Sequence, residues 1–160
     1  ILFLMKRILN LMLIAAMCCL MGCQPDENRV FDTTAAAGIA GTYTGVWSMV
    51  DSKGNTGETK GTVVFAEVEG NPYLVTMTID AAGVGYTGSC KANVAHAGDE
   101  YVYYNNAAAE LLPADSPEDA TVPQFQGRVK IDGTTGFDFK LKTGKGRNAK
   151  TTTYTFTGAR

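Results

Sequence analysis

Polar and apolar residues alternate with a period of two along most of the chain after residue 40. Successive side chains of a β-strand point to opposite faces, so this alternation is typical of strands with one buried and one solvated face. The pattern predicts eight strands, over residues 43–50, 59–68, 73–80, 84–92, 100–105, 124–131, 135–142 and 150–157. For the second of these strands, residues 59–68, the sequence leaves open which face points inward.

Short links rich in Gly, Asn, Asp and Pro separate the predicted strands, and Asp132-Gly133 is the strongest signal for a tight hairpin. The longest interruption spans 106–123, where residues 107–112 can form a brief helix that Pro113 ends. Short links favour sequential antiparallel neighbours, whereas a Greek key needs long crossovers. We therefore predict one all-β domain over residues 41–160, a single antiparallel eight-stranded up-and-down β-barrel, with a two-sheet β-sandwich as the alternative.

Large side chains on the apolar faces of the strands predict what fills the barrel. An eight-stranded barrel is wide enough for a packed core or for one small ligand. We expect a ligand cavity in which Gly45, Gly88 and Gly127 provide room, although such glycines also serve to let barrel strands bend. The predicted lining residues are Tyr43, Trp47, Met49, Tyr86, Phe137, Phe139 and Tyr154.

An almost wholly apolar run, residues 8–21, precedes this domain and follows Lys6 and Arg7. The run is short for a helix that crosses a hydrocarbon core of roughly 30 Å, and its length is typical of the apolar region of a secretory signal. We predict a signal peptide over residues 1–22, with Met5 as the true start, and a flexible tether over residues 23–40.

The residues Leu20-Met21-Gly22-Cys23 resemble the lipobox of bacterial lipoproteins. This resemblance implies cleavage before Cys23, a lipid on Cys23 and attachment to a membrane through that lipid. It places the protein at the outer membrane or cell surface of a Gram-negative cell, on the periplasmic or the extracellular face. The run Gln24-Pro25-Asp26-Glu27 is similar to an acidic surface-export signal of some lipoproteins, and it also suits a solvated tether.

Gly45-Val46-Trp47 lies in the first predicted strand, and Arg160 lies just after the last one. This combination resembles lipocalins and the wider calycin group, in which an arginine from the last strand packs over the tryptophan of a Gly-x-Trp motif. The resemblance implies a lipocalin-like barrel with Trp47 and Arg160 closing one end. A cation over an indole face contributes about 0.5–2 kcal/mol. Simple core packing of Trp47 is the alternative explanation for this tryptophan.

The charge of the chain is mildly acidic, with a formal value of −2 that becomes −4 when Lys6 and Arg7 leave with the signal. A mildly acidic chain lacks the net positive charge that attracts the phosphates of nucleic acid, so no nucleic-acid partner is expected. Residues 128–160 hold eight basic residues against two acidic ones. They predict a basic sheet face, either solvated or suited to an acidic glycan or a lipid headgroup.

Catalytic and metal-binding motifs are not evident in the sequence. His96 is the single histidine, no His/Cys cluster accompanies it, and we find no phosphate loop, dinucleotide fingerprint or nucleophile elbow. We therefore expect no catalytic residue, no metal and no cofactor. Cys90 shares its strand face with apolar residues, which predicts a buried and unreactive thiol.

The run of residues 101–106, Tyr-Val-Tyr-Tyr-Asn-Asn, is the most ligand-like stretch, because tyrosine and asparagine can stack on and hydrogen-bond a sugar. A plain strand with Tyr101 and Tyr103 in the core and Tyr104 outside is the favoured interpretation. The predicted function is a non-catalytic, lipid-anchored protein that binds a small apolar or amphipathic ligand in its barrel. The alternative is a surface interaction module that binds a partner protein or a glycan through its loops or its basic face.

Overall fold

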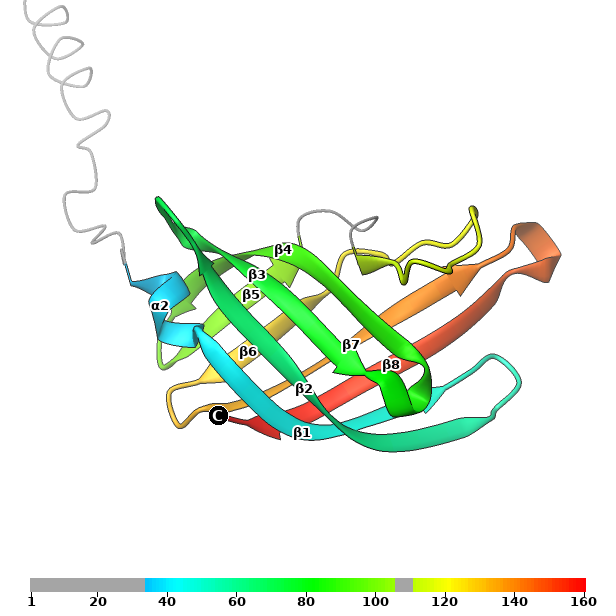
Figure 1. Ribbon diagram of the computed structural model, residues 1–160, viewed down its shortest axis with the longest axis horizontal. Coiled ribbons are helices and arrows are strands. Elements are labelled where there is room, and N and C mark those ends of the chain that lie inside the picture. The colour runs from blue at the N-terminus through cyan, green and yellow to red at the C-terminus, as the bar shows by residue number, and fades with distance from the viewer. Residues whose placement is uncertain (1–33, 106–110) are drawn as a thin grey trace, which may run out of the picture. The chain divides into compact units, whose positions relative to one another are not determined.

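The computed structural model describes residues 34–105 and 111–160. Eight antiparallel strands form one closed barrel in which each strand pairs with the next and β8 pairs with β1 (Figure 1). The predicted up-and-down barrel is therefore confirmed, and the two-sheet alternative is wrong. The strands are β1 (Gly41–Val50), β2 (Thr56–Val68), β3 (Asn71–Ala81), β4 (Tyr86–Ala97), β5 (Glu100–Asn105), β6 (Gln126–Lys130), β7 (Thr134–Thr143) and β8 (Lys150–Ala159).

Several predictions fall on parts of the chain outside the described residues. These are the signal peptide over residues 1–22, the lipidation of Cys23, the first part of the tether and most of the brief helix at 107–112. The expected anchor and its membrane therefore stay predictions.

Buried apolar side chains of all eight strands form one cluster inside the barrel. In β2 the side chains of Val63 and Phe65 are buried, so its odd-numbered residues face inward. The inward positions nearer its start carry Gly57, Thr59 and Gly61, which are small or polar. Their weak apolar contrast explains why the sequence did not decide the inward face and why β2 begins earlier than predicted.

One end of the barrel, which we call the helix end, is closed by helix α2 (Ala35–Ile39). Ala35, Ala36 and Ile39 of this helix are buried, and the hydroxyl of Tyr43 donates a hydrogen bond to the carbonyl of Ile39 at 2.9 Å. The expectation of a tether that reaches residue 40 is therefore wrong. A helix of five residues is too short to show a helical period, and its burial depends on strands distant in sequence.

The opposite end, which we call the loop end, carries the β1–β2, β3–β4, β5–β6 and β7–β8 connections. The β3–β4 connection contains the 3₁₀ turn η1 (Ala82–Val84), and the β7–β8 connection contains the 3₁₀ turn η3 (Gly146–Asn148). The described part of the β5–β6 connection folds against the barrel, because Leu111, Val122 and Phe125 are buried. The hydroxyl of Tyr86 donates a hydrogen bond to the carbonyl of Leu111 and fixes this connection to β4.

The hairpin between β6 and β7 lies at the helix end and forms as predicted at Asp132-Gly133. Gly133 has a φ of 84°, a left-handed conformation that glycine adopts without strain. The Asp132 carboxylate accepts hydrogen bonds from the backbone N–H and the hydroxyl of Thr134 at 2.8 and 2.7 Å. These bonds favour the ionised carboxylate and lower the pKa of Asp132.

Candidate functional site

The barrel interior brings the seven predicted lining residues together, with Met49 only partly buried. The ring of Trp47 lies 4.8 Å from that of Phe156 and 5.5 Å from that of Phe137, measured between centroids. Phe139 stacks on Tyr154 at 5.2 Å, and the Tyr86 ring lies 4.8 Å from each of these two. At this level of the barrel, the rings are therefore packed against one another as a core.

The three glycines that were expected to leave room are instead places of close approach. A Cβ atom at Gly45 would lie 2.6 Å from the Cα of Gly158, and one at Gly127 would lie 2.6 Å from Cε2 of the Tyr103 ring. At Gly88 it would lie 2.9 Å from the carbonyl oxygen of Leu111. Neighbouring backbone or a ring already occupies each position, so the expectation that these glycines open a cavity is wrong.

Polar atoms inside the barrel are mostly partnered. The hydroxyl of Tyr103 lies 3.5 Å from that of Thr135, which donates to the Arg128 carbonyl at 2.7 Å. Burial raises the pKa of Tyr86 and of Tyr103 above the ordinary value, because the ionised phenolate would lose its hydration. Among the described residues, Trp47 Nε1 and Asn105 Nδ2 are buried donors that have no hydrogen-bond acceptor.

The predicted closing pair of Trp47 and Arg160 is not formed. Arg160 lies over the ring of Tyr43, 5.7 Å from its centroid, and donates hydrogen bonds to the carbonyl oxygens of Ala40 at 2.9 Å and Gly38 at 3.3 Å. The β1–β8 register explains why Trp47 and Arg160 do not meet, since Trp47 is opposite Phe156 while Thr44 is opposite Ala159. Arg160 therefore lies one position beyond the level of Thr44 and holds the C-terminal end of α2.

The wall of the barrel is irregular between β6 and β7. These strands pair only at Arg128–Gly136 and Val129–Thr135, and the next bridge to β7 is Thr121–Lys142. Between Thr121 and Arg128 the chain does not pair with β7, so β6 is shorter than the predicted strand over residues 124–131.

Phe125 fills the inner side of this irregular wall. Its ring stacks on that of Phe137 at 5.5 Å, and its N–H donates to Asn105 Oδ1 at 2.8 Å.

On the outer side of this wall lie two shallow, adjoining cavities. One has a volume of about 430 Å³ and the other of about 300 Å³. Both are lined by Gln124, Phe125 and Gln126, and we call their union the outer groove. The first cavity adds Tyr104, and the second adds Pro123, Asp138, Phe139 and Lys140.

Tyr104 is the large exposed aromatic side chain of the outer groove, with 40% of its surface accessible. The strand register places Asn93 of β4 on one side of Tyr104 and Gln126 of β6 on the other. Tyr103 is buried, so the predicted division of this strand into an inner and an outer tyrosine is confirmed. Tyr101 is only partly buried.

The groove therefore combines an aromatic face with amide and carboxylate groups, a chemistry suited to a ligand with hydroxyl groups and a flat apolar face. Gln124, Gln126, Asp138 and Lys140 were not predicted as site residues. Their alternation with buried neighbours placed them outside the barrel, but only the strand register brings them beside Tyr104.

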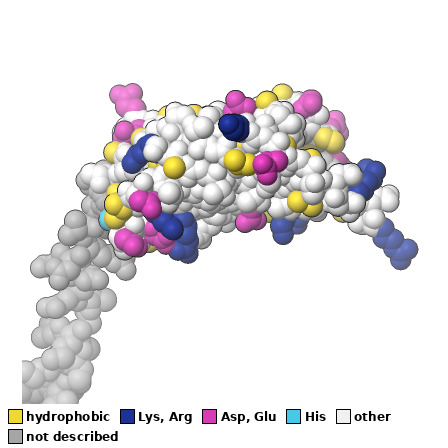
Figure 2. Space-filling view, turned by 90° about the horizontal axis from the view of Figure 1, so that it is seen from below, with side chains coloured by type: hydrophobic (Ala, Val, Ile, Leu, Met, Phe, Trp, Pro, Cys, Tyr) yellow, Lys and Arg dark blue, Asp and Glu magenta, His cyan; other side chains and the backbone are white. Residues whose placement is uncertain are grey.

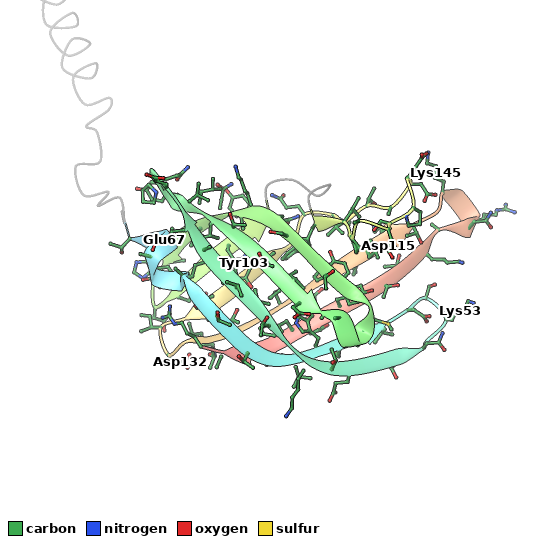
Figure 3. The ribbon with its side chains drawn as sticks, in the orientation of Figure 1. Lys53, Glu67, Tyr103, Asp115, Asp132 and Lys145 are labelled. Atoms are coloured by element: carbon green, nitrogen blue, oxygen red, sulfur yellow. The ribbon has the colours of Figure 1, made fainter. Side chains whose placement is uncertain are left out.

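The basic residues of 128–160 fall into two groups rather than one face. Arg128 and Lys130 lie near the helix end, where Arg128 forms an ion pair with Glu100. Lys145 lies at the tip of the β7–β8 hairpin, at the opposite end from Asp132 (Figure 3). In the space-filling view, Lys and Arg side chains project at the right-hand end of the molecule (Figure 2).

Cys90 and His96, the cysteine and the histidine of the described residues, occupy different surroundings. Cys90 is buried as predicted, with 3% of its surface accessible. His96 is exposed and stacks on the ring of Tyr101 at 4.7 Å. In residues 34–105 and 111–160, no three His, Cys, Asp or Glu side chains are grouped closely enough to hold a metal ion.

No protein-family model matches the chain, and no curated protein matches it significantly. The described residues contain no helix with the length and apolar character needed to span a membrane. The class of this protein is therefore defined by its fold and its outer groove alone. It is a closed eight-stranded up-and-down barrel with an aromatic and amide groove on its wall.

Proposed function

We propose that this chain is a non-catalytic, lipid-anchored binding protein of the cell envelope whose barrel is a rigid scaffold and whose outer groove binds a glycan. The observation that carries this proposal is the exposed ring of Tyr104 beside the amides of Gln124 and Gln126. The resemblance of residues 20–23 to a lipobox supports the anchor on Cys23.

Such a groove binds a sugar through both stacking and hydrogen bonding. A sugar ring presents one face of C–H groups, which packs on an exposed aromatic ring, and an edge of hydroxyl groups, which amides and carboxylates bind. The groove residues lie on or beside strands, and Phe125 among them is fixed by Phe137 and Asn105. A rigid support of this kind limits the ordering cost of binding.

Titration of the purified chain with a panel of oligosaccharides, followed by calorimetry, tests the glycan proposal. We expect Tyr104→Ala to weaken binding at least about tenfold, since the loss of a stacking partner removes on the order of 1.5 kcal/mol. Val50→Ala is the matched control, because Val50 is an equally exposed apolar residue on β1, with 47% of its surface accessible. Equal binding by the wild type and Tyr104→Ala would contradict the proposal.

A second candidate function is an amphipathic ligand inside the barrel. The observation that favours it is the pair of buried donors without an acceptor, Trp47 Nε1 and Asn105 Nδ2. A buried N–H without an acceptor costs about 1–3 kcal/mol, which an acceptor oxygen of a ligand would recover. A fatty acid that changes Trp47 fluorescence and is displaced by no sugar would favour this function over the glycan.

The anchor has its own test. Expression of the full chain with labelled fatty acid should give a labelled protein that fractionates with membranes, because each buried CH₂ group contributes about 0.8 kcal/mol. Cys23→Ala should remove both the label and the membrane fraction. A labelled, membrane-bound Cys23→Ala protein would exclude Cys23 as the anchor.

A further inference from the structure

The β7–β8 hairpin is the most one-sided charged feature of the described residues. Residues 139–150 hold five basic side chains and no Asp or Glu. All five are exposed, and the hairpin extends beyond the barrel at the loop end (Figure 1). The basic residues are Lys140, Lys142, Lys145, Arg147 and Lys150.

This charged hairpin is continuous with the outer groove. Lys140 lines the groove, and Lys142 follows it on the same outer face of β7, roughly 7 Å further along the strand. Lys150 pairs in register with Thr143, so it lies on the neighbouring strand just past Lys142 but on the opposite face of the hairpin. A ligand that leaves the groove along the outer face of β7 therefore meets Lys140 and then Lys142 before it reaches the turn, which carries Lys145 and Arg147.

Acidic residues lie beside the start of this track but not on residues 139–150 of the hairpin itself. Asp138 lies in the groove itself, where its carboxylate can accept hydrogen bonds from hydroxyl groups. Asp115, Glu118 and Asp119 belong to the β5–β6 connection, which meets β7 at the Thr121–Lys142 bridge. The groove thus suits neutral hydroxyls, whereas the hairpin beyond it suits anions.

We infer that the glycan bound in the outer groove is an acidic polysaccharide whose carboxylate or sulfate groups pair with the β7–β8 hairpin. This inference rests on the proposed glycan function and names the class of glycan. The formal charge of the whole chain is −2, so a broad anionic surface would be repelled elsewhere on the molecule. A single extended polymer, in contrast, can follow one narrow basic track.

Binding of the purified chain to polygalacturonate and to its methyl ester tests the inference, because the two polymers share a backbone and differ in charge. We expect polygalacturonate to bind at least about tenfold more tightly at low salt, since several exposed ion pairs each multiply the affinity a few fold. Raising the salt from about 0.01 M to about 1 M should abolish the difference, because the screening length falls from about 30 Å to about 3 Å.

Two charge-matched variants locate the effect. Lys145→Glu/Arg147→Glu should lose most of the preference for polygalacturonate and keep the affinity for the ester. Lys53→Glu/Lys60→Glu changes the net charge equally on β1–β2 and should keep the preference. Circular dichroism checks that both variants fold.

Each alternative result has a defined meaning. Equal affinity for both polymers, with both lost in Tyr104→Ala, would overturn the acidic class and leave the glycan function standing. No binding of polygalacturonate at low salt would overturn the acidic class as well, because the charge attraction does not depend on the identity of the sugar. Binding of anionic phospholipid vesicles through Lys145 and Arg147, without binding of polygalacturonate, would assign the hairpin to a lipid surface instead.

Discussion

Replacement of Gly127 by alanine tests whether the barrel interior is packed or hollow. Gly127 lies on β6 and faces inward, and a Cβ atom there would lie 2.6 Å from Cε2 of the Tyr103 ring. Real Cβ atoms do not approach other atoms closer than 3.0 Å, so the ring or the strand must move. The ring is fully buried and is 4.8 Å from Phe65 and 5.8 Å from Phe137 between centroids, and these neighbours restrict its movement.

The magnitude follows from two opposing terms. Overpacking of a well-packed core costs about 1–3 kcal/mol. Alanine also restricts the unfolded chain, which returns about 0.4–1 kcal/mol. We therefore expect Gly127→Ala to lower the free energy of unfolding by about 1–2 kcal/mol, which is a drop in Tm of roughly 5 °C for a domain of this size.

Chemical denaturation and thermal melts of the purified chain measure this change. Gly136→Ala is the matched control, because it makes the same replacement on the next strand and its Cβ would meet only the Phe156 carbonyl oxygen at 3.6 Å. We expect that control to be neutral or slightly stabilising. Tyr103→Leu combined with Gly127→Ala should cost less than the sum of the single changes, because the smaller side chain removes the clash.

One result would refute the reasoning. If Gly127→Ala is as harmless as Gly136→Ala, the space beside Gly127 is open and the interior is not packed there. The barrel ligand would then become the better candidate function.

Four further predictions concern the core, the closed end, pH and the thiol. Phe139→Trp should destabilise the domain by about 1–3 kcal/mol, measured by chemical denaturation, and a stable variant would indicate empty space. Arg160→Ala should accelerate amide exchange in α2, which loses two hydrogen bonds to its C-terminal end, while exchange in β4 should not change. Burial raises the pKa of Tyr86 and Tyr103, so the unfolded chain releases these protons first. The contribution of these two tyrosines to the free energy of unfolding should therefore be constant below about pH 10 and fall above it, by up to about 1.4 kcal/mol per pH unit for each tyrosine; a profile that stays flat between about pH 10 and pH 12 would contradict this. Cys90 should react with a thiol reagent far more slowly in the folded chain than in denaturant, and equal rates would show an accessible thiol.

Much of the fold could be predicted from the sequence because successive side chains of a strand alternate between its two faces, so apolar residues recur with a period of two. Tyr154 and Phe156 alternate with threonines, and Phe137 and Phe139 alternate with charged residues, so their strands and inward faces follow directly. The Asp132-Gly133 hairpin is equally local, since it depends on the conformational freedom of one glycine and on one side-chain cap. Local rules of this kind need no knowledge of the partner strand.

What the tertiary structure decided depends on the register between strands. Register moves Arg160 from Trp47 to Tyr43, and it brings Tyr104, Gln126 and Lys140 from three strands to one groove. It also fills the positions beside Gly45 and Gly127 with a neighbouring backbone and a ring, where the sequence alone predicted free space. The sequence determines which face of each strand a side chain occupies, but the distances between strands exist only once the barrel has closed, and those distances decide between a cavity, a core and a groove.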